Sequence, residues 1–117
     1  MEIQRFNPTY KNWHCAAVVY GDLIFLSGVV PDDKLLPIKG QVEQVLQKIE
    51  RTLASVGSNK SRILSATVHL ADLGMKEDMN QVWQAWVDKD NMPARTAVGA
   101  TLTPNTLVEI TVCAAKA

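Results

Sequence analysis

Residues 38–56 read IKGQVEQVLQKIERTLASV, and their apolar side chains recur at intervals of three and four. This spacing is typical of one face of an amphipathic helix. Gly57 follows, and glycine commonly ends a helix because it tolerates the left-handed backbone found there. We therefore predict a helix over 38–56 that packs one face against a sheet. That face consists of Ile38, Val42, Val45, Leu46, Ile49, Leu53 and Val56.

Strand patterns lie on both sides of this helix. Gly21-Asp22 separates two apolar runs, and such a pair favours a tight hairpin turn. Downstream, apolar and polar residues alternate in two runs, as they do in half-buried strands, and Pro93 opens another strand between them. The predicted strands are residues 13–20, 23–28, 62–71, 93–100 and 107–114.

A second amphipathic helix is predicted over residues 76–89. Together these elements predict an α+β fold in the order ββαβαββ with two helices on one face of the sheet. We expect a six-stranded mixed sheet, although this order contains only five of the strands. The other face carries small or polar side chains that favour a subunit contact over bulk water. The second helix has Met79, Val82, Trp83 and Trp86 on its apolar face. Strand 62–71 turns Leu64, Ala66, Val68 and Leu70 to one side. The opposite face of the sheet presents Ser65, Thr67, Glu109 and Thr111.

Composition limits the function classes. A chain of 117 residues is the size of one domain, so we predict a single domain over 1–117. Twelve basic and twelve acidic side chains balance to zero net charge, without the basic stripe typical of nucleic-acid binders. The N-terminus lacks the apolar run of a secretory signal, and Leu23–Leu26 is too short to span a bilayer. Cys15 and Cys113 are interpreted as reduced thiols, so we expect a cytoplasmic protein. From the charge balance and the short apolar runs we expect neither nucleic-acid nor membrane partners.

Few residues form a recognisable catalytic pattern. His14 and His69 have no second ligand nearby in the sequence, so no metal site is predicted, and no glycine loop or other motif calls for a cofactor. His69, at the end of a strand, reads as a structural histidine. Arg95 and Glu109 each lie seven residues from Leu102, so a hairpin centred there places them opposite one another. The pair either performs chemistry or is a cross-strand ion pair that only sets register.

Several segments resemble the Rid family of reactive intermediate deaminases, also called YjgF-like proteins. Residues 27–31 resemble its Ser-Gly-x-x-Pro segment, residues 93–95 its Pro-x-Arg signature, residues 108–110 its C-terminal Glu-Ile strand, and residues 78–80 its second helix. The resemblance covers nearly the whole chain in order. Residues 57–64 and the tryptophan-rich second helix are most similar to the YoaB-like branch.

The resemblance implies a chorismate-mutase-like fold and a homotrimer with clefts between subunits. It implies hydrolysis of reactive enamines and imines, such as 2-aminoacrylate, to 2-keto acids and ammonia. The arginine matching Arg95 holds the substrate carboxylate, and the glutamate matching Glu109 positions the attacking water. The glycine matching Gly28 contributes backbone contacts. We expect Ser27, Asn80 and His14 to complete the substrate site.

The chain departs from the studied deaminases at two positions of the expected site. His14 stands where they have a tyrosine, and Ala97 stands where they have a cysteine, which leaves the substrate range open. A non-catalytic module that binds a small 2-keto or amino acid is the alternative function. Glu109 discriminates between the two, because hydrolysis needs its carboxylate and simple binding does not. A third function, endoribonuclease or translation inhibitor, is disfavoured by the zero net charge.

Overall fold

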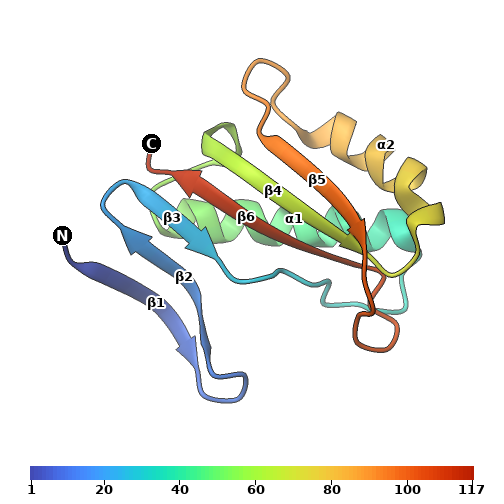
Figure 1. Cartoon of the computed structure of the whole chain (residues 1–117), viewed down its shortest axis with the longest axis horizontal. Helices are drawn as coiled ribbons and strands as arrows, with labels where there is room; N and C mark the ends of the chain where they lie inside the picture. The colour runs from blue at the N-terminus through green and yellow to red at the C-terminus, as the bar shows by residue number, and fades with distance from the viewer.

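The computed structural model describes residues 1–117 and contains one six-stranded sheet with two α-helices on one face (Figure 1). The strand order is β1-β2-β3-β6-β4-β5. Neighbouring strands are antiparallel except β4 and β5, which run parallel. The strands are β1 (Ile3–Thr9), β2 (His14–Tyr20), β3 (Leu23–Leu26), β4 (Ile63–Leu70), β5 (Ala94–Gly99) and β6 (Val108–Ala115). The helices are α1 (Ile38–Ser55) and α2 (Lys76–Trp86), with short 3₁₀ turns η1 (Lys60–Arg62) and η2 (Leu73–Met75).

The N-terminal strand β1 is absent from the elements predicted from sequence. It pairs antiparallel with β2, with Ile3 opposite Tyr20 and Thr9 opposite His14. Most of its side chains are exposed, so this edge strand lacks the apolar alternation that marks a half-buried strand. The six-stranded sheet is confirmed, but the order of elements is βββαβαββ and the predicted order ββαβαββ is wrong.

The last two strands do not form the hairpin predicted around Leu102. β5 pairs only with β4, and β6 lies between β3 and β4. α2 carries the chain across from β4 to β5, and a strand reached by such a crossover runs parallel to its neighbour. β6 takes a central position because alternate side chains along it are fully buried beneath α1. These are Val108, Ile110, Val112 and Ala114.

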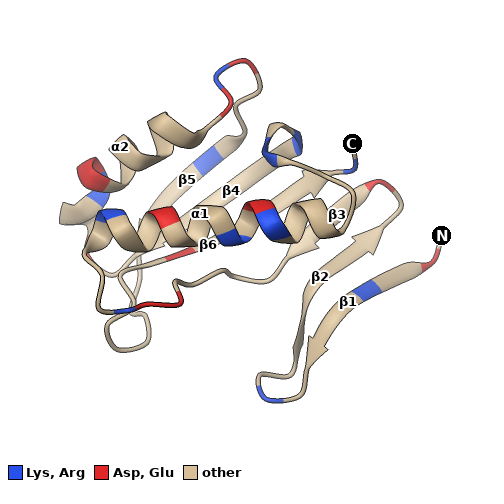
Figure 2. Cartoon of the chain, turned by 180° about the vertical axis from the view of Figure 1, so that it is seen from behind, with Lys and Arg blue, Asp and Glu red and all other residues tan.

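The hydrophobic core lies between the sheet and α1, which crosses in front of the strands in the view of Figure 2. All seven apolar positions predicted for residues 38–56 are buried. The helix ends as expected, because Gly57 adopts a positive φ of 82° and the Ser58 N–H donates to the Leu53 carbonyl over 2.9 Å. The predicted turn at Gly21-Asp22 is also confirmed, since β2 and β3 pair up to Tyr20 and Leu23.

A β-bulge at the start of β4 corrects the predicted orientation of Leu64. The pairing with β6 shifts register between Ile63 and Ser65. An extra residue in one strand moves its neighbours to the other face. Ile63 is therefore 4% exposed and belongs to the core, whereas Leu64 is 48% exposed. From Ala66 onward the alternation follows the prediction, with Val68 and Leu70 buried.

α2 is shorter than predicted but uses the predicted apolar face. Met79 and Trp83 are buried, and Val82 and Trp86 pack against the core. The helix ends at Trp86 because the next residue is extended, with ψ of 144°. The Lys60 ammonium donates to the Trp86 carbonyl over 2.7 Å and so satisfies a carbonyl at the helix end.

The sheet face away from the helices is uncovered within one chain (Figures 1 and 2). Phe25 is exposed there, on the opposite side of β3 from the buried Ile24 and Leu26. Val98 of β5 is exposed as well and pairs with His69. Neither helix is long and apolar enough to cross a membrane.

Candidate active site

Arg95 lies on β5 and its side chain packs against α2. It is in register with Ala66 of β4, a core residue, so both side chains point to the helix side of the sheet. The Arg95 Nη2 donates to Asn80 Oδ1 over 2.7 Å. Its guanidinium carbon lies 5.1 Å from the centroid of the Trp83 ring, within the range of a cation–π contact. These contacts hold the guanidinium in one orientation.

The charge of Arg95 has no carboxylate partner in the chain. Both ion pairs lie elsewhere, Lys48 with Asp32 and Lys60 with Glu50. Burial lowers the pKa of Arg95 below its usual value, because removal from water disfavours the charged form. An arginine stays protonated at neutral pH even so. A half-buried guanidinium of this kind gains free energy when it binds an anion, and a carboxylate fits its two parallel donors.

Glu109 and Gly28 lie together on the other side of the sheet. Glu109 alternates with the buried Val108 and Ile110, so its side chain points to the uncovered face. Two hydrogen bonds between Val29 and Ile110, of 2.9 and 3.0 Å, hold the segment after β3 alongside β6. A Cβ atom at residue 28 would collide with the Glu109 carboxylate. Glycine at this position therefore lets the carboxylate lie against the backbone.

His14 and Ser27 line a cavity that also contains Gly28. The cavity has a volume of about 260 Å³. The Ser27 hydroxyl donates to the Cys15 carbonyl over 2.6 Å, so it ties the end of β3 to the start of β2. His14 is exposed at the start of β2. The cavity is lined by Asn12, His14, Ala16, Ser27, Gly28, Val29, Val30, Lys48 and Thr52.

The structure thus separates the predicted site residues into two groups within one chain. Arg95 and Asn80 form one group beside α2. His14, Ser27 and Gly28 line the 260 Å³ cavity, and Glu109 joins this second group through its contact with Gly28, although it does not line the cavity itself. Arg95 is opposite Ala66 and Glu109 is opposite His69, with β4 between them. Two strand spacings and three residues along β4 put the Cα atoms of Arg95 and Glu109 roughly 14 Å apart.

The expected juxtaposition of Arg95 and Glu109 is therefore wrong for a single chain. The alternative of a cross-strand ion pair fails for the same reason, because their side chains point to opposite faces. His69 instead lies beside Glu109, and its Nδ1 is 3.1 Å from the Glu109 carbonyl oxygen, so the imidazole N–H donates to the backbone. This contact agrees with the structural role predicted for His69.

Trp83 is the residue of the Arg95 group that sequence reasoning missed. Its pattern indicated only a core or interface position. Asn80 and Trp83 are three residues apart on α2, so both face β5. Because Asn80 was already expected in the site, this spacing could have indicated that Trp83 lies there too.

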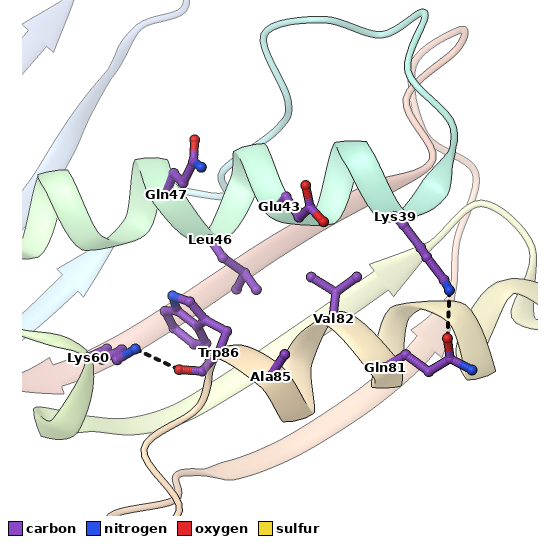
Figure 3. A pocket seen from close by; sticks show the side chains of 9 residues that line it. All are labelled: Lys39, Glu43, Leu46, Gln47, Lys60, Gln81, Val82, Ala85 and Trp86. Carbon is purple, nitrogen blue, oxygen red and sulfur yellow. Dashed lines mark hydrogen bonds between the residues drawn. The ribbon is translucent and has the colours of Figure 1, made fainter.

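A further cavity, of about 430 Å³, lies between α1 and α2 (Figure 3). Leu46, Val82 and Trp86 form its apolar part. At one end the Lys39 ammonium donates to Gln81 Oε1 over 2.6 Å. None of the predicted site residues lines this cavity, so it is separate from both groups.

Residues 4–116 match the family described as Endoribonuclease L-PSP. The chain belongs to this family. A crystal structure of a YjgF-family protein from Neisseria meningitidis is 40% identical, with a TM-score of 0.94, over 100% of this chain and 97% of that one. A RutC family protein of Haemophilus influenzae is 37% identical over 97% of this chain and 98% of its own length. The RutC family protein YoaB of Escherichia coli is 37% identical over 84% of this chain and 86% of its own length.

Membership of the L-PSP family confirms the predicted relation to YjgF-like (Rid) proteins. The likeness to YoaB agrees with the branch indicated by residues 57–64 and α2. The chain has the chorismate-mutase-like fold of L-PSP family members, as predicted. The RutC names describe a family and assign no activity, so the function rests on the two groups of residues.

Proposed function

We propose that this protein hydrolyses reactive 2-imino acids, and their enamine tautomers, to 2-keto acids and ammonia. The observation that carries the proposal is the half-buried Arg95 guanidinium, which is oriented by Asn80 and Trp83 and lacks a carboxylate partner. A substrate carboxylate supplies that partner. One more distant relative supports the chemistry by its name, Reactive Intermediate Deaminase A of Arabidopsis thaliana, which is 28% identical over 88% of this chain and 58% of its own length.

The reaction needs orientation and a proton acceptor. Arg95 binds the carboxylate and so presents the adjacent imine carbon. The Glu109 carboxylate accepts a proton from water while the water oxygen bonds to that carbon. Transfer of a proton to nitrogen then lets the C–N bond break, and ammonia leaves the 2-keto acid behind. The carbon is already electrophilic, so these steps require no covalent nucleophile.

The same proposal requires two copies of the chain. In a 2-imino acid the carboxylate carbon and the imine carbon are bonded neighbours. One such molecule cannot reach Arg95 and Glu109 across roughly 14 Å and on opposite faces of one sheet. We therefore propose that Arg95 of one copy faces Glu109, Gly28 and His14 of another, in a homotrimer built on the uncovered sheet faces.

A carboxylate-binding module without catalysis is the second candidate. It is favoured by the fact that only the anion-binding group around Arg95 is complete within one chain. The endoribonuclease activity in the family description finds less support. Basic and acidic residues are interspersed along the chain's elements instead of forming a basic stripe (Figure 2), and their charges sum to zero. Such a surface makes few contacts with the phosphates of a nucleic acid.

The test measures 2-keto acid release from freshly generated 2-aminoacrylate. The wild type should accelerate release, and Arg95→Ala should abolish the acceleration. Arg62→Ala is the matched control, because Arg62 is an exposed arginine of η1 that neither lines the 260 Å³ cavity nor contacts Arg95. Equal release with and without wild-type protein would reject the deaminase.

Glu109→Gln separates the enzyme from the binding module. Glutamine keeps the shape but cannot accept a proton at neutral pH, so hydrolysis should fall by about 10²–10⁴-fold. A 2-keto acid should still bind, because Arg95 is untouched. Melting temperature, 2-keto acid affinity and hydrolysis rate are measured on the same preparation. Full hydrolysis by a well-folded Glu109→Gln variant would favour the binding module.

A further inference from the structure

The turn between β1 and β2 carries two exposed aromatic side chains. Tyr10 is 74% exposed and Trp13 is 79% exposed. Their rings form an edge-to-face pair with centroids 5.8 Å apart. Because they contact each other at the tip of a hairpin and leave most of their surface in water, they add little to the free energy of folding.

The backbone conformation at residue 13 makes a tryptophan there still less favourable for folding. Trp13 has a positive φ of 59°, a conformation that suits glycine and is uncommon for a bulky side chain. The turn is closed by the Trp13 N–H, which donates to the Thr9 carbonyl over 2.8 Å and needs no particular side chain. A tryptophan held in this conformation and exposed to water points to a role other than stability.

The aromatic pair borders the group of site residues that contains Gly28. A cavity of about 190 Å³ is lined by Pro8, Thr9, Tyr10, Trp13, His14 and Cys15. His14 also lines the 260 Å³ cavity that contains Ser27 and Gly28. The two cavities thus share His14 in their linings, and both members of the aromatic pair line the smaller one.

We infer that Tyr10 and Trp13 bind the side chain of the substrate and select 2-imino acids with a large apolar or aromatic side chain. This inference rests on the proposed deaminase site and names its specificity. A cavity of about 150 Å³ is sufficient to hold a benzene ring, so a phenyl group suits the space beside the pair. Edge-to-face contacts with two aromatic rings favour a third planar apolar group.

The test compares a small and a large substrate on the wild type and on Trp13→Gly. An amino acid oxidase generates 2-iminopropanoate or 2-imino-3-phenylpropanoate in place, and 2-keto acid release gives kcat/KM for each. The wild type should prefer the phenyl substrate. Trp13→Gly should reduce that preference by about 10-fold, the loss of one aromatic contact, while the rate with 2-iminopropanoate stays nearly unchanged. Its melting temperature should stay equal or rise, since glycine relieves the positive φ.

Asn105→Gly is the matched control, because it makes the same backbone change at a positive φ of 66° in the β5–β6 loop. It should leave the preference unaltered.

The affinities of pyruvate and 3-phenyl-2-oxopropanoate give a second measure that needs no catalysis. A wild type that binds and hydrolyses both substrates without preferring phenyl, or a preference that survives Trp13→Gly, overturns the inference and leaves the deaminase standing. Equal losses for both substrates, together with dissociation in sedimentation, would show that the pair contacts a second copy instead. A wild type that neither binds nor hydrolyses either compound rejects the deaminase and the inference together.

Discussion

At the scale of single residues, the candidate site depends on how a few side chains are held. Asn80 and Trp83 orient the Arg95 guanidinium from one side of the sheet. Gly28 makes room for the Glu109 carboxylate on the other. Each of these arrangements depends on one chemical property of one residue, either the planar guanidinium or the missing Cβ. Conservative substitutions at Arg95 and Gly28 therefore test the site most directly.

Arg95→Lys should reduce kcat/KM for imine hydrolysis despite keeping the positive charge. A lysine cannot form the two parallel hydrogen bonds to a carboxylate, and it loses the flat contact with Trp83. We expect a loss of roughly 10-fold or more, about 1.4 kcal/mol of transition-state stabilisation. Steady-state kinetics on the folded variant measure this loss. Turnover close to that of the wild type would leave Arg95 with a structural role only.

Gly28→Ala should impair hydrolysis because its new methyl group displaces the Glu109 carboxylate. Misplacement of a catalytic group typically costs roughly 10–100-fold in rate. The control is the same substitution in a Glu109→Asp background, where the shorter side chain no longer lies against residue 28. There Gly28→Ala should have little further effect, so the two changes should not be additive. Additive losses would mean that Gly28 acts independently of Glu109.

Among the elements, Gln41 links α1 to the segment that precedes the helix and to the loop between β5 and β6. It is fully buried. The two N–H bonds of its Nε2 are shared among the carbonyl oxygens of Lys34, Leu36 and Asn105, which lie 3.0–3.2 Å from the nitrogen. Its Oε1 accepts from the Leu107 N–H over 2.8 Å. Leu107 directly precedes β6, so Gln41 fixes the start of that strand. It thereby also fixes the position of Glu109 along β6.

Gln41→Leu should destabilise the fold by about 2–4 kcal/mol, because it leaves the Leu107 N–H and several carbonyls buried without partners. Urea unfolding measures the change. Gln47→Leu is the matched control on the same helix, since Gln47 is exposed and its amide has no hydrogen bond in the chain. It should change stability by less than about 0.5 kcal/mol. Equal effects of the two substitutions would contradict the role of Gln41.

At the scale of the whole molecule, one chain presents an incomplete site and an uncovered sheet face. Exposed apolar side chains such as Phe25 and Val98 lie on that face. Both features are explained together if copies of the chain associate through their sheets. The resemblance to YjgF-like proteins implies three copies, so we expect sedimentation to find a trimer at micromolar concentration. A stable monomer would remove the proposed two-copy site.

Mixing two inactive variants tests the shared site itself. Arg95→Ala keeps Glu109, and Glu109→Gln keeps Arg95, so a mixed trimer contains some clefts with both native groups. After unfolding and refolding an equal mixture, about one quarter of the clefts should be native if neighbouring copies contribute one group each. Activity should recover to about that fraction, whereas each variant refolded alone stays inactive. No recovery in mixed trimers would place both groups in the same copy.

Elements with local signals could be predicted from the amino-acid sequence. The spacing of three and four from Ile38 to Val56, with Gly57 after it, was sufficient for α1 and its buried face. Gly21-Asp22 was sufficient for the turn between β2 and β3. The motifs around Ser27-Gly28, Arg95 and Glu109 were sufficient for the family. Each of these signals depends only on which side chains a short segment buries, or on the backbone that it requires.

The identity of neighbouring strands, and with it the position of the site residues, could not be predicted from local sequence and depends on the whole fold. Residues 95 and 109 are equally far from Leu102 whether their strands form a hairpin or have β4 between them. The choice depends on the crossover through α2 and on the burial of β6 beneath α1, which are properties of the whole sheet. The exposed strand β1 and the bulge at Leu64 also leave no periodic pattern in the sequence, because both depend on pairing with other strands of the sheet. Long-range pairing is settled by the total free energy of packing, and no short segment of sequence encodes it.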